Sequence, residues 1–302
     1  MYVDDIIFGS NEEAMSQKFA LVMQKEFEMS LLGELTYFLG LQVQQNKDGI
    51  FLSQTKYLKQ ILKKYRMEDS KLVCTPMVTG CSLSGNDEST TIHQPTYRSI
   101  IGSLLYLIGT RLDIMHAVGI VGRFQENPKE AHLQVVKRIF KYLQGTQNFF
   151  LWYPRDTDLT LHAYTDADWA GILDDRKRTS GGAFFMGSIL VSWFSKKQSS
   201  IALSTTEAEY VAIASCRTQL IWMMQTLQDI QITCTPPISI LCDNTSAISI
   251  SKNLIMHFKT KHIPIKYHFL QEQVLEQKVK LEYLPSIEQV ADIFTKPLPK
   301  EI

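Results

Sequence analysis

Apolar and polar positions follow two different periods along this chain, and each period predicts its own kind of element. In the first part, apolar residues three and four apart predict one helix that begins at Asn11 and another over residues 56–65. Between these helices, residues 37–44 and 50–53 have the pattern of strands, and the Asn-Lys-Asp-Gly segment at 46–49 has the composition of a tight turn. We therefore expect a β-hairpin between two helices.

The composition changes between residues 75 and 95, where Gly, Ser, Thr, Asn, Asp and Pro dominate and no period is visible. This segment is predicted to be a linker. Three helical stretches follow it, and the third is predicted to begin with Asn127 as its cap and Pro128 in its first turn. In that stretch Val136, Phe140 and Leu143 recur at helical spacing, so we expect these helices to pack on one another.

From Leu159 onward the pattern is that of strands, with three of them in succession and then helices alternating with two more. The expected strands are residues 159–166, 182–187, 189–195, 238–242 and 280–284. The expected helices begin at Thr205, lie near Ala247 and around His268, and end the chain. This order predicts an α/β (α+β) domain with a mixed five-stranded sheet flanked by helices.

The composition argues against a strongly basic protein, a secreted protein and a membrane protein. Lys plus Arg equals Asp plus Glu, at 31 each, so any basic surface for nucleic acid must be local. The 5 cysteines form no ligand pattern and are predicted to be reduced thiols. No secretory signal is visible, and the apolar runs fall short of the roughly 20 residues that span a bilayer. We expect a soluble, intracellular protein without membrane contact.

Four acidic residues fall at the ends of predicted elements or just inside them: Asp166, Glu207, Asp243 and Asp292. Two-metal hydrolysis needs several carboxylates that converge from different elements and hold two ions roughly 4 Å apart. Hard oxygen ligands of this kind favour Mg²⁺ or Mn²⁺. The four positions are therefore candidates for ligands of such ions.

Each acid also has a structural interpretation that needs no site. Asp166 could open a turn, and Asp243 could cap the helix that follows it. Glu207 lies three residues after Ser204, which is the spacing of a capping box, and Asp292 could be a solvated helix position. For any one acid alone, the structural interpretation is the better one. The four acids together are a more specific signal, because the segments around them resemble those of a known family.

At these acids the sequence resembles a known family. The segments are YTDADWAG at 164–171, STTEAEY at 204–210, CDN at 242–244 and VADIFTK at 290–296. In order and spacing they are similar to the RNase H motifs of copia-type LTR-retrotransposon Pol polyproteins. The resemblance implies an RNase H fold in which Asp166, Glu207 and Asp243, together with Asp292, bind two Mg²⁺ or Mn²⁺ ions.

The same resemblance implies that Asp168 and Glu209 point away from the metal site. Asp168 stays ambiguous, because on a strand of period two it shares a face with Asp166. The implied reaction is hydrolysis of the RNA strand in RNA–DNA hybrids, in which the 2′-hydroxyl identifies the RNA.

The resemblance covers nearly the whole chain, with further similar segments at 97–107, 176–181 and 192–198. The family usually has proline at the position of Leu112, aspartate at that of Pro264 and arginine at that of Gln271. Pro264 is expected to disturb the helix before His268. None of these departures removes a proposed metal ligand.

The first residues, YVDD at 2–5, resemble the hairpin that carries the polymerase metal site of reverse transcriptases. Asp4 and Asp5 would be its two aspartates, and residues 39–43 resemble the primer-holding region. Polymerisation also needs an earlier aspartate and the fingers, so we expect no polymerase activity from this chain alone. The alternative is that remaining reverse-transcriptase segments of a full polyprotein, or a separate protein, supply the missing half.

The resulting organisation is a truncated reverse transcriptase (palm end and thumb start) at 1–74, a linker at 75–95, a helical connection region at 96–157 and an RNase H domain at 158–302. Basic residues around the four acids are predicted to bind the hybrid, although short basic runs are more often solvated turns. They are Arg176, Lys177, Arg178, Lys196, Lys197, His262 and His268.

Two hypotheses of different classes follow. The first is an active, metal-dependent endoribonuclease that acts on RNA–DNA hybrids, in a cytoplasmic particle or in the nucleus. The second is a catalytically inactive retrotransposon remnant that only binds nucleic acid or a partner, and a domesticated host protein with a regulatory role cannot be separated from it by sequence. The four intact acids favour the enzyme.

Overall fold

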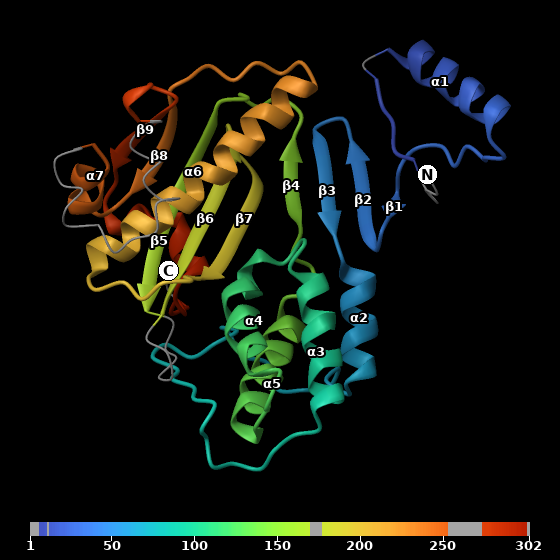
Figure 1. Ribbon diagram of the computed structural model, residues 1–302. Coiled ribbons are helices and arrows are strands. Elements are labelled where there is room, and N and C mark those ends of the chain that lie inside the picture. The colour runs from blue at the N-terminus through green and yellow to red at the C-terminus, as the bar shows by residue number, and fades with distance from the viewer. Residues whose placement is uncertain (1–5, 11, 170–176, 253–273, 301–302) are drawn as a thin grey trace.

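In the part of the chain that the structure describes, the strands form two β-sheets, and a group of helices packs beneath both of them (Figure 1). The computed structural model describes all residues except 1–5, 11, 170–176, 253–273 and 301–302. Within the described residues, no helix is long and apolar enough to cross a membrane.

The larger sheet has five strands in the order β7-β6-β5-β8-β9. Strands β5 (Leu161–Trp169), β6 (Arg178–Met186) and β7 (Ile189–Lys197) form an antiparallel meander. Strands β8 (Ile238–Cys242) and β9 (Val279–Tyr283) then run parallel to β5. The predicted mixed five-stranded sheet flanked by helices is therefore confirmed.

Helix α6 (Thr205–Asp229) lies across one face of this sheet (Figure 1). The apolar side of the helix shares a core with Leu161 and Ala163 of β5; it consists of Tyr210, Val211, Ile213, Ala214, Cys216, Leu220, Met223 and Leu227. A short helix, α7 (Thr245–Lys252), follows β8. The chain returns to β5 and β6 through the short 3-10 helices η5 (Ser286–Glu288) and η6 (Val290–Phe294), where a final helix was expected.

The smaller sheet has the order β1-β2-β3-β4. The predicted hairpin is present as β2 (Leu41–Asn46) and β3 (Gly49–Ser53), preceded by β1 (Tyr37–Phe38). Strand β4 (Leu151–Pro154) pairs antiparallel with β3 and was not predicted. The pairing connects the N-terminal hairpin to the segment that leads into the larger sheet.

The helices form one common core beneath the sheets. They are α2 (Thr55–Lys64), α3 (Gln94–Leu107), η1 (Leu112–Ile114), α4 (Met115–Val121), η2 (Gly122–Phe124) and α5 (Glu130–Gly145), and we call them the helical unit. Helix α5 begins after Lys129, so the predicted cap at Asn127 is wrong. The expected packing of these helices on one another is confirmed, and α2 packs with them.

The segment 75–95, which was predicted to be a linker, is partly packed against the helical unit. Met77 is 3% exposed and Leu83 8% exposed, and both side chains belong to the core of the helical unit. Thr91 also forms a β-bridge with Lys129, at the start of α5. The segment therefore packs as part of the helical unit.

Helix α1 (Glu13–Glu26) stands apart from the other elements (Figure 1). Ala20 is its one buried side chain, whereas Phe19, Leu21 and Val22 are exposed. The predicted cap of this helix, Asn11, lies outside the described residues.

Candidate metal centre

The candidate site is centred on Asp166, near the carboxyl end of β5. Its side chain is only 5% exposed, and its backbone pairs with Gly181 of β6. The Thr295 hydroxyl, just after η6, donates a hydrogen bond to Asp166 Oδ2. The carboxyl groups of Glu209 and Asp292 both lie within hydrogen-bonding reach of Asp166.

Asp292 is brought to Asp166 by η6. Its Oδ2 forms an ion pair of 2.8 Å with Lys296 Nζ, whereas its Oδ1 is buried and has no hydrogen-bond partner. Burial and the nearby charge of Asp166 raise the pKa of Asp292, although the Lys296 ammonium opposes them. The fields of the carboxylates in turn raise the pKa of Lys296 against the effect of its burial.

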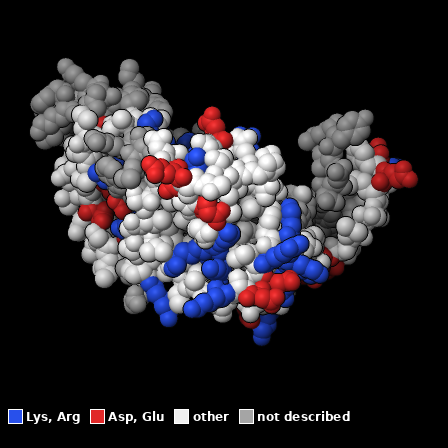
Figure 2. Space-filling model, turned by 90° about the horizontal axis from the view of Figure 1, so that it is seen from below, with Lys and Arg blue, Asp and Glu red and all other residues white. Residues whose placement is uncertain are grey.

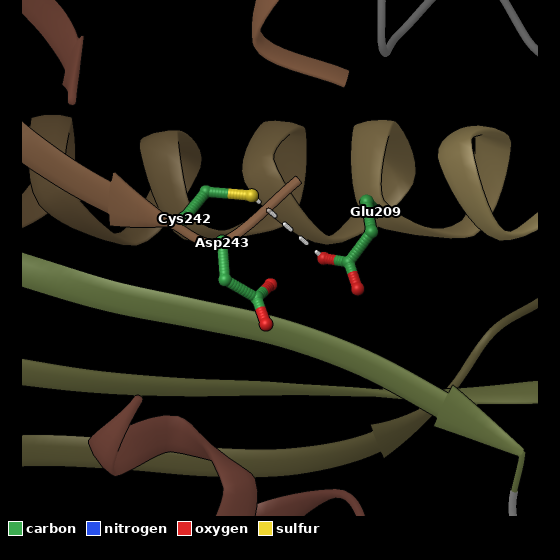
Figure 3. Close-up of side chains that lie close together, drawn as sticks. All are labelled: Glu209, Cys242 and Asp243. Atoms are coloured by element: carbon green, nitrogen blue, oxygen red, sulfur yellow. Dashed lines mark hydrogen bonds between the residues drawn. The ribbon is translucent and has the colours of Figure 1, made fainter. Parts of the chain in front are cut away.

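Glu209 reaches the cluster from the first turns of α6, and Asp243 from the end of β8 (Figure 3). Glu209 Oε1 accepts a hydrogen bond of 3.2 Å from the Ala167 N–H. The Cys242 thiol donates to Glu209 Oε2 over 3.9 Å, and ligand atoms of Glu209, Cys242 and Asp243 all lie within 4.8 Å of one another.

The electrostatics of Glu209 reflect this crowding. Glu209 is 6% exposed. Burial, followed by the negative charges of Asp166 and Asp243, raises the pKa of Glu209 to about 9. Carboxylates brought together in this way repel one another unless a cation shares them.

Asp243 is not the cap of α7. The cap is Asn244, whose Oδ1 accepts a hydrogen bond of 2.9 Å from the Ala247 N–H. Asp243 instead accepts a hydrogen bond of 2.6 Å from the Ser286 hydroxyl of η5. The capping interpretation of Asp243 is therefore wrong, and its carboxylate is held beside Glu209.

Glu207 has a different role. Its backbone N–H donates to Ser204 Oγ over 3.1 Å, and its carboxylate accepts a hydrogen bond of 2.8 Å from the Leu203 N–H. Residues two apart on a helix point in nearly opposite directions, so Glu207 and Glu209 cannot both face Asp166. The expectation that Glu209 points away from the acids is wrong, and the local contacts of Glu207 are those of a helix N-terminus.

The sequence contains a pattern that could have identified Glu209 as a residue that faces the sheet. Five of the apolar residues that α6 buries in this core, at positions 213, 216, 220, 223 and 227, recur in alternating steps of three and four. One further step of four toward the N-terminus leads to Glu209, not to Glu207. An acid that continues an apolar stripe is directed at the same neighbour as the stripe, which here is the sheet.

Asp168 lies two residues beyond Asp166 on β5 and pairs with Thr179. Its charge contributes to the raised pKa of Lys296, after the contributions of Asp292 and Asp166. Asp168 therefore borders the cluster on the side of Lys296.

The donor set fits a hard divalent cation. It consists of carboxylate oxygens from four separate elements, among them the buried, unpartnered Asp292 Oδ1. Buried charges are unstable unless they are paired or coordinate a metal. Oxygen donors of this kind suit Mg²⁺ or Mn²⁺, whereas the Cys242 thiol at the edge of the group does not.

Two of the predicted substrate-binding lysines, Lys196 and Lys197, line a groove between β7 and α6. The groove also contains hydroxyl and amide side chains, namely Ser199, Ser215, Thr218 and Gln219, and it extends to Ser180. Ser180 is the β6 partner of Ala167, next to Asp166.

Arg178 begins β6, and Lys177 precedes it. Although the net charge is +0, several Lys and Arg side chains lie close together in the lower middle of the face seen in Figure 2, with Asp and Glu side chains among them. The other residues named from the sequence lie outside the described residues: Asp4, Asp5, Arg176, His262, Pro264, His268 and Gln271.

The family described as reverse transcriptase (RNA-dependent DNA polymerase) matches residues 1–79. The chain is 38% identical, over 99% of its length, to the retrovirus-related Pol polyprotein from transposon RE1 of Arabidopsis thaliana, and covers 20% of that protein. It is 37% identical, again over 99% of its length, to that from transposon TNT 1-94 of Nicotiana tabacum, and covers 23% of it.

The chain thus spans about a fifth of the length of these curated relatives. Among solved structures, an RNase H1 isolated from compost, LC11-RNase H1, aligns with 45% of this chain and 93% of its own. The identity is 13% and the TM-score 0.32.

Proposed function

Because this chain belongs to the family of retrovirus-related Pol polyproteins of copia-type transposons, we propose that it is a metal-dependent endoribonuclease of the RNase H type that cleaves the RNA strand of RNA–DNA hybrids. One observation carries the proposal: Asp166, Glu209, Asp243 and Asp292 come from four elements, with Glu209 and Asp292 beside Asp166 and with Asp243 beside Glu209. This set differs from the sequence-based one by the exchange of Glu207 for Glu209.

These four carboxylates would hold two Mg²⁺ or Mn²⁺ ions. When bound, the ions supply positive charge that makes a water molecule more acidic and offsets negative charge on the scissile phosphate. The oxygen donors, their burial and the unpartnered Asp292 Oδ1 support this assignment.

The chain's own residues orient the carboxylates. The Thr295 hydroxyl fixes Asp166 Oδ2, the Ala167 N–H fixes Glu209 Oε1, and Ser286 fixes Asp243 Oδ2. Second-sphere hydrogen bonds of this kind set the direction in which a ligand presents its oxygens. Lys296 holds a proton and a positive charge at Asp292 Oδ2, on the border of the cluster.

The hybrid would bind across the groove between β7 and α6. Lys196 and Lys197 are suited to contact phosphates there, and the hydroxyl and amide groups of the groove to contact the backbone of the nucleic acid. Lys177 and Arg178 extend this basic surface in the proposal. The roles of Arg176, His262 and His268 remain predictions, as do those of Asp4 and Asp5 as a polymerase remnant.

The test is incubation of the purified chain with an RNA–DNA hybrid, labelled on either strand, with Mg²⁺ or Mn²⁺. Single-stranded RNA and duplex DNA serve as substrate controls. Asp243→Asn removes a ligand charge without changing its shape. Glu288→Gln makes the same kind of change at an exposed position in η5, and is the matched control.

We expect cleavage of the RNA strand of the hybrid alone, retained in Glu288→Gln and lost in Asp243→Asn. If the folded wild-type chain cleaves nothing with either ion, it is not an active endoribonuclease. Hybrid binding without turnover would then identify the inactive remnant. Cleavage that persists in Asp243→Asn would show that the activity comes from elsewhere.

A further inference from the structure

The position of the Asp292 carboxylate is set by η6, a short helix that its own hydrogen bonds do not hold in place. Helix η6 spans five residues, Val290–Phe294, and 3-10 helices of this length have few internal hydrogen bonds of good geometry. Its last carbonyl groups also lack partners within the helix. The place of Asp292 relative to Asp166 must therefore be set by what η6 packs against.

On one side, η6 is held by the larger sheet. The Gln289 amide donates a hydrogen bond of 3.0 Å to the Thr165 carbonyl of β5. At Gly181 of β6, an added Cβ would lie only 2.7 Å from Thr295 Cγ2 and 2.9 Å from Phe294 Cβ. The sheet thus contacts both ends of η6 closely.

On the other side, η6 is held by the helical unit, whose η1 and α4 both contact it. His116 of α4 is 4% exposed, and its ring lies within hydrogen-bonding reach of the Phe294 backbone. The His116 Nδ1 has no hydrogen-bond partner, so Nε2–H is the donor that can reach the Phe294 carbonyl. A residue far from the larger sheet in the sequence therefore lies against a terminal carbonyl of η6.

A second link joins the helical unit to the larger sheet beside the site. Arg123 of η2 donates a hydrogen bond of 2.9 Å to Thr179 Oγ1. Thr179 is fully buried on β6 and is the pairing partner of Asp168. The helical unit thus contacts both η6 and the strand next to β5.

We propose that His116 is a positioning residue for Asp292, through which the helical unit takes part in the metal centre. The inference rests on the proposed function for its consequence in catalysis, but the hydrogen bond to Phe294 can be tested without it. Loss of that bond leaves a buried carbonyl unsatisfied and releases the side of η6 that faces away from the sheet. A displacement of about 1 Å in a catalytic group can lower a rate by about a hundredfold.

The variant His116→Leu removes the N–H donor and keeps an apolar side chain, whereas His116→Gln restores a donor. The matched control is His132→Leu, because His132 is also fully buried in the helical unit. Its ring nitrogens bond the Lys129 N–H and the Ser84 carbonyl instead. Both leucine variants lose a buried histidine, and only one of them loses a contact with η6.

The first readout is amide hydrogen exchange over residues 290–296, which needs neither metal nor substrate. We expect exchange there to rise about tenfold or more in His116→Leu, to be largely restored in His116→Gln and to stay unchanged in His132→Leu. The second readout is Mn²⁺ affinity by calorimetry, with kcat and KM for hybrid cleavage. His116→Leu should weaken Mn²⁺ binding and kcat by about 10- to 100-fold, as changes around metal ligands typically do, with little change in KM.

Unchanged exchange over residues 290–296 in folded His116→Leu would overturn the proposal, as would an equal rise in His132→Leu. If the wild type cleaves no hybrid but exchange responds as expected, the proposed function fails while the positioning role of His116 stands. If exchange responds and Mn²⁺ affinity does not, His116 holds η6 without affecting the metal centre, and the proposal is wrong.

Discussion

At the scale of single residues, the buried carboxylates show a conflict between folding and function. Folding places Glu209 near Asp166 and Asp243 and raises its pKa from 4.5 to about 9. Between these values the folded state retains a proton that the unfolded chain releases, so the free energy of unfolding falls as pH rises. At pH 7 the raised pKa of Glu209 therefore lowers the free energy of unfolding by about 3 kcal/mol. A bound cation would offset it.

Glu209→Gln should therefore have opposite effects on stability and activity. Without metal, we expect the free energy of unfolding at pH 7 to rise by about 1–3 kcal/mol, because the amide carries no charge to desolvate. Hybrid cleavage should fall by more than about a hundredfold, beyond the usual effect of a second-sphere change. Thermal melting in EDTA and in Mn²⁺ measures the first effect, and single-turnover cleavage the second.

Glu207→Gln is the control for this prediction. Its contacts with Leu203 and Ser204 are those of a helix N-terminus, so we expect a loss of up to about 1 kcal/mol and cleavage within a few-fold of wild type. The reverse pattern, with activity lost in Glu207→Gln and kept in Glu209→Gln, would show that Glu207 and not Glu209 is the metal ligand.

At the scale of elements, the larger sheet and η6 form one functional assembly. Strand β5 carries Asp166, β8 leads to Asp243, and η6 presents Asp292 against β6. Contact between η6 and β6 is close because Gly181 has no side chain, and Thr295, which bonds Asp166, lies directly over it. The absence of a Cβ at Gly181 thus sets a distance within the site.

Gly181→Ala should displace η6 and lower both stability and activity. The new Cβ would lie 2.7 Å from Thr295 Cγ2 and 3.0 Å from the Ala291 carbonyl, so one side must move. Overpacking of this kind costs about 1–3 kcal/mol. Urea unfolding and hybrid cleavage would measure the two losses.

Gly102→Ala is the matched control, since Gly102 lies in α3 and an added Cβ meets nothing within 4 Å. Alanine there should raise the free energy of unfolding by up to about 1 kcal/mol and leave cleavage unchanged. If Gly181→Ala behaves like Gly102→Ala, η6 is not held by close contact with β6.

At the scale of the whole molecule, the helical unit joins the two sheets. Its core includes α2, which follows β3, and α5, which leads into β4, and the pairing of β3 with β4 closes this connection. On its other side, α4 and η1 contact η6. His116 lies at that junction, buried beside Arg123, and is the group there that should respond to acid.

The junction should make the protein sensitive to mild acid. Burial, and secondarily the charge of Arg123, lowers the pKa of His116 from 6.5 to about 4, although the hydrogen bond to Phe294 opposes this. The unfolded chain therefore gains a proton at a higher pH than the folded chain does. Stability should decrease by about 3 kcal/mol as pH falls from 6.5 to about 4.

Urea unfolding at a series of pH values measures this slope. His116→Leu should be less stable at pH 7 and should lose the part of the slope between pH 6.5 and 4 that belongs to His116. An identical slope in the variant would assign the acid sensitivity to other groups.

Much of the architecture could be predicted from local patterns. Strand β8 has the predicted bounds, α6 begins at the predicted Thr205, and the predicted turn at 46–49 is present, with the Asp48 and Gly49 N–H groups donating to Asn46 Oδ1. These features depend on contacts between near neighbours in the chain, which a periodic pattern records. Strand β4 was missed because its pairing partner, β3, lies far away in the sequence.

Local sequence patterns were enough to predict the mixed sheet, the family and the presence of acids at the ends of its elements. Long-range contacts were needed to show that Glu209 faces Asp166, that Asn244 and not Asp243 caps α7, and that Met77 and Leu83 of the segment 75–95 are buried in a core. The physical reason is the range of the interactions. Periodicity and capping act over a few residues, whereas the direction of a carboxylate is decided by partners as distant as Thr295 is from Asp166, 129 positions along the chain.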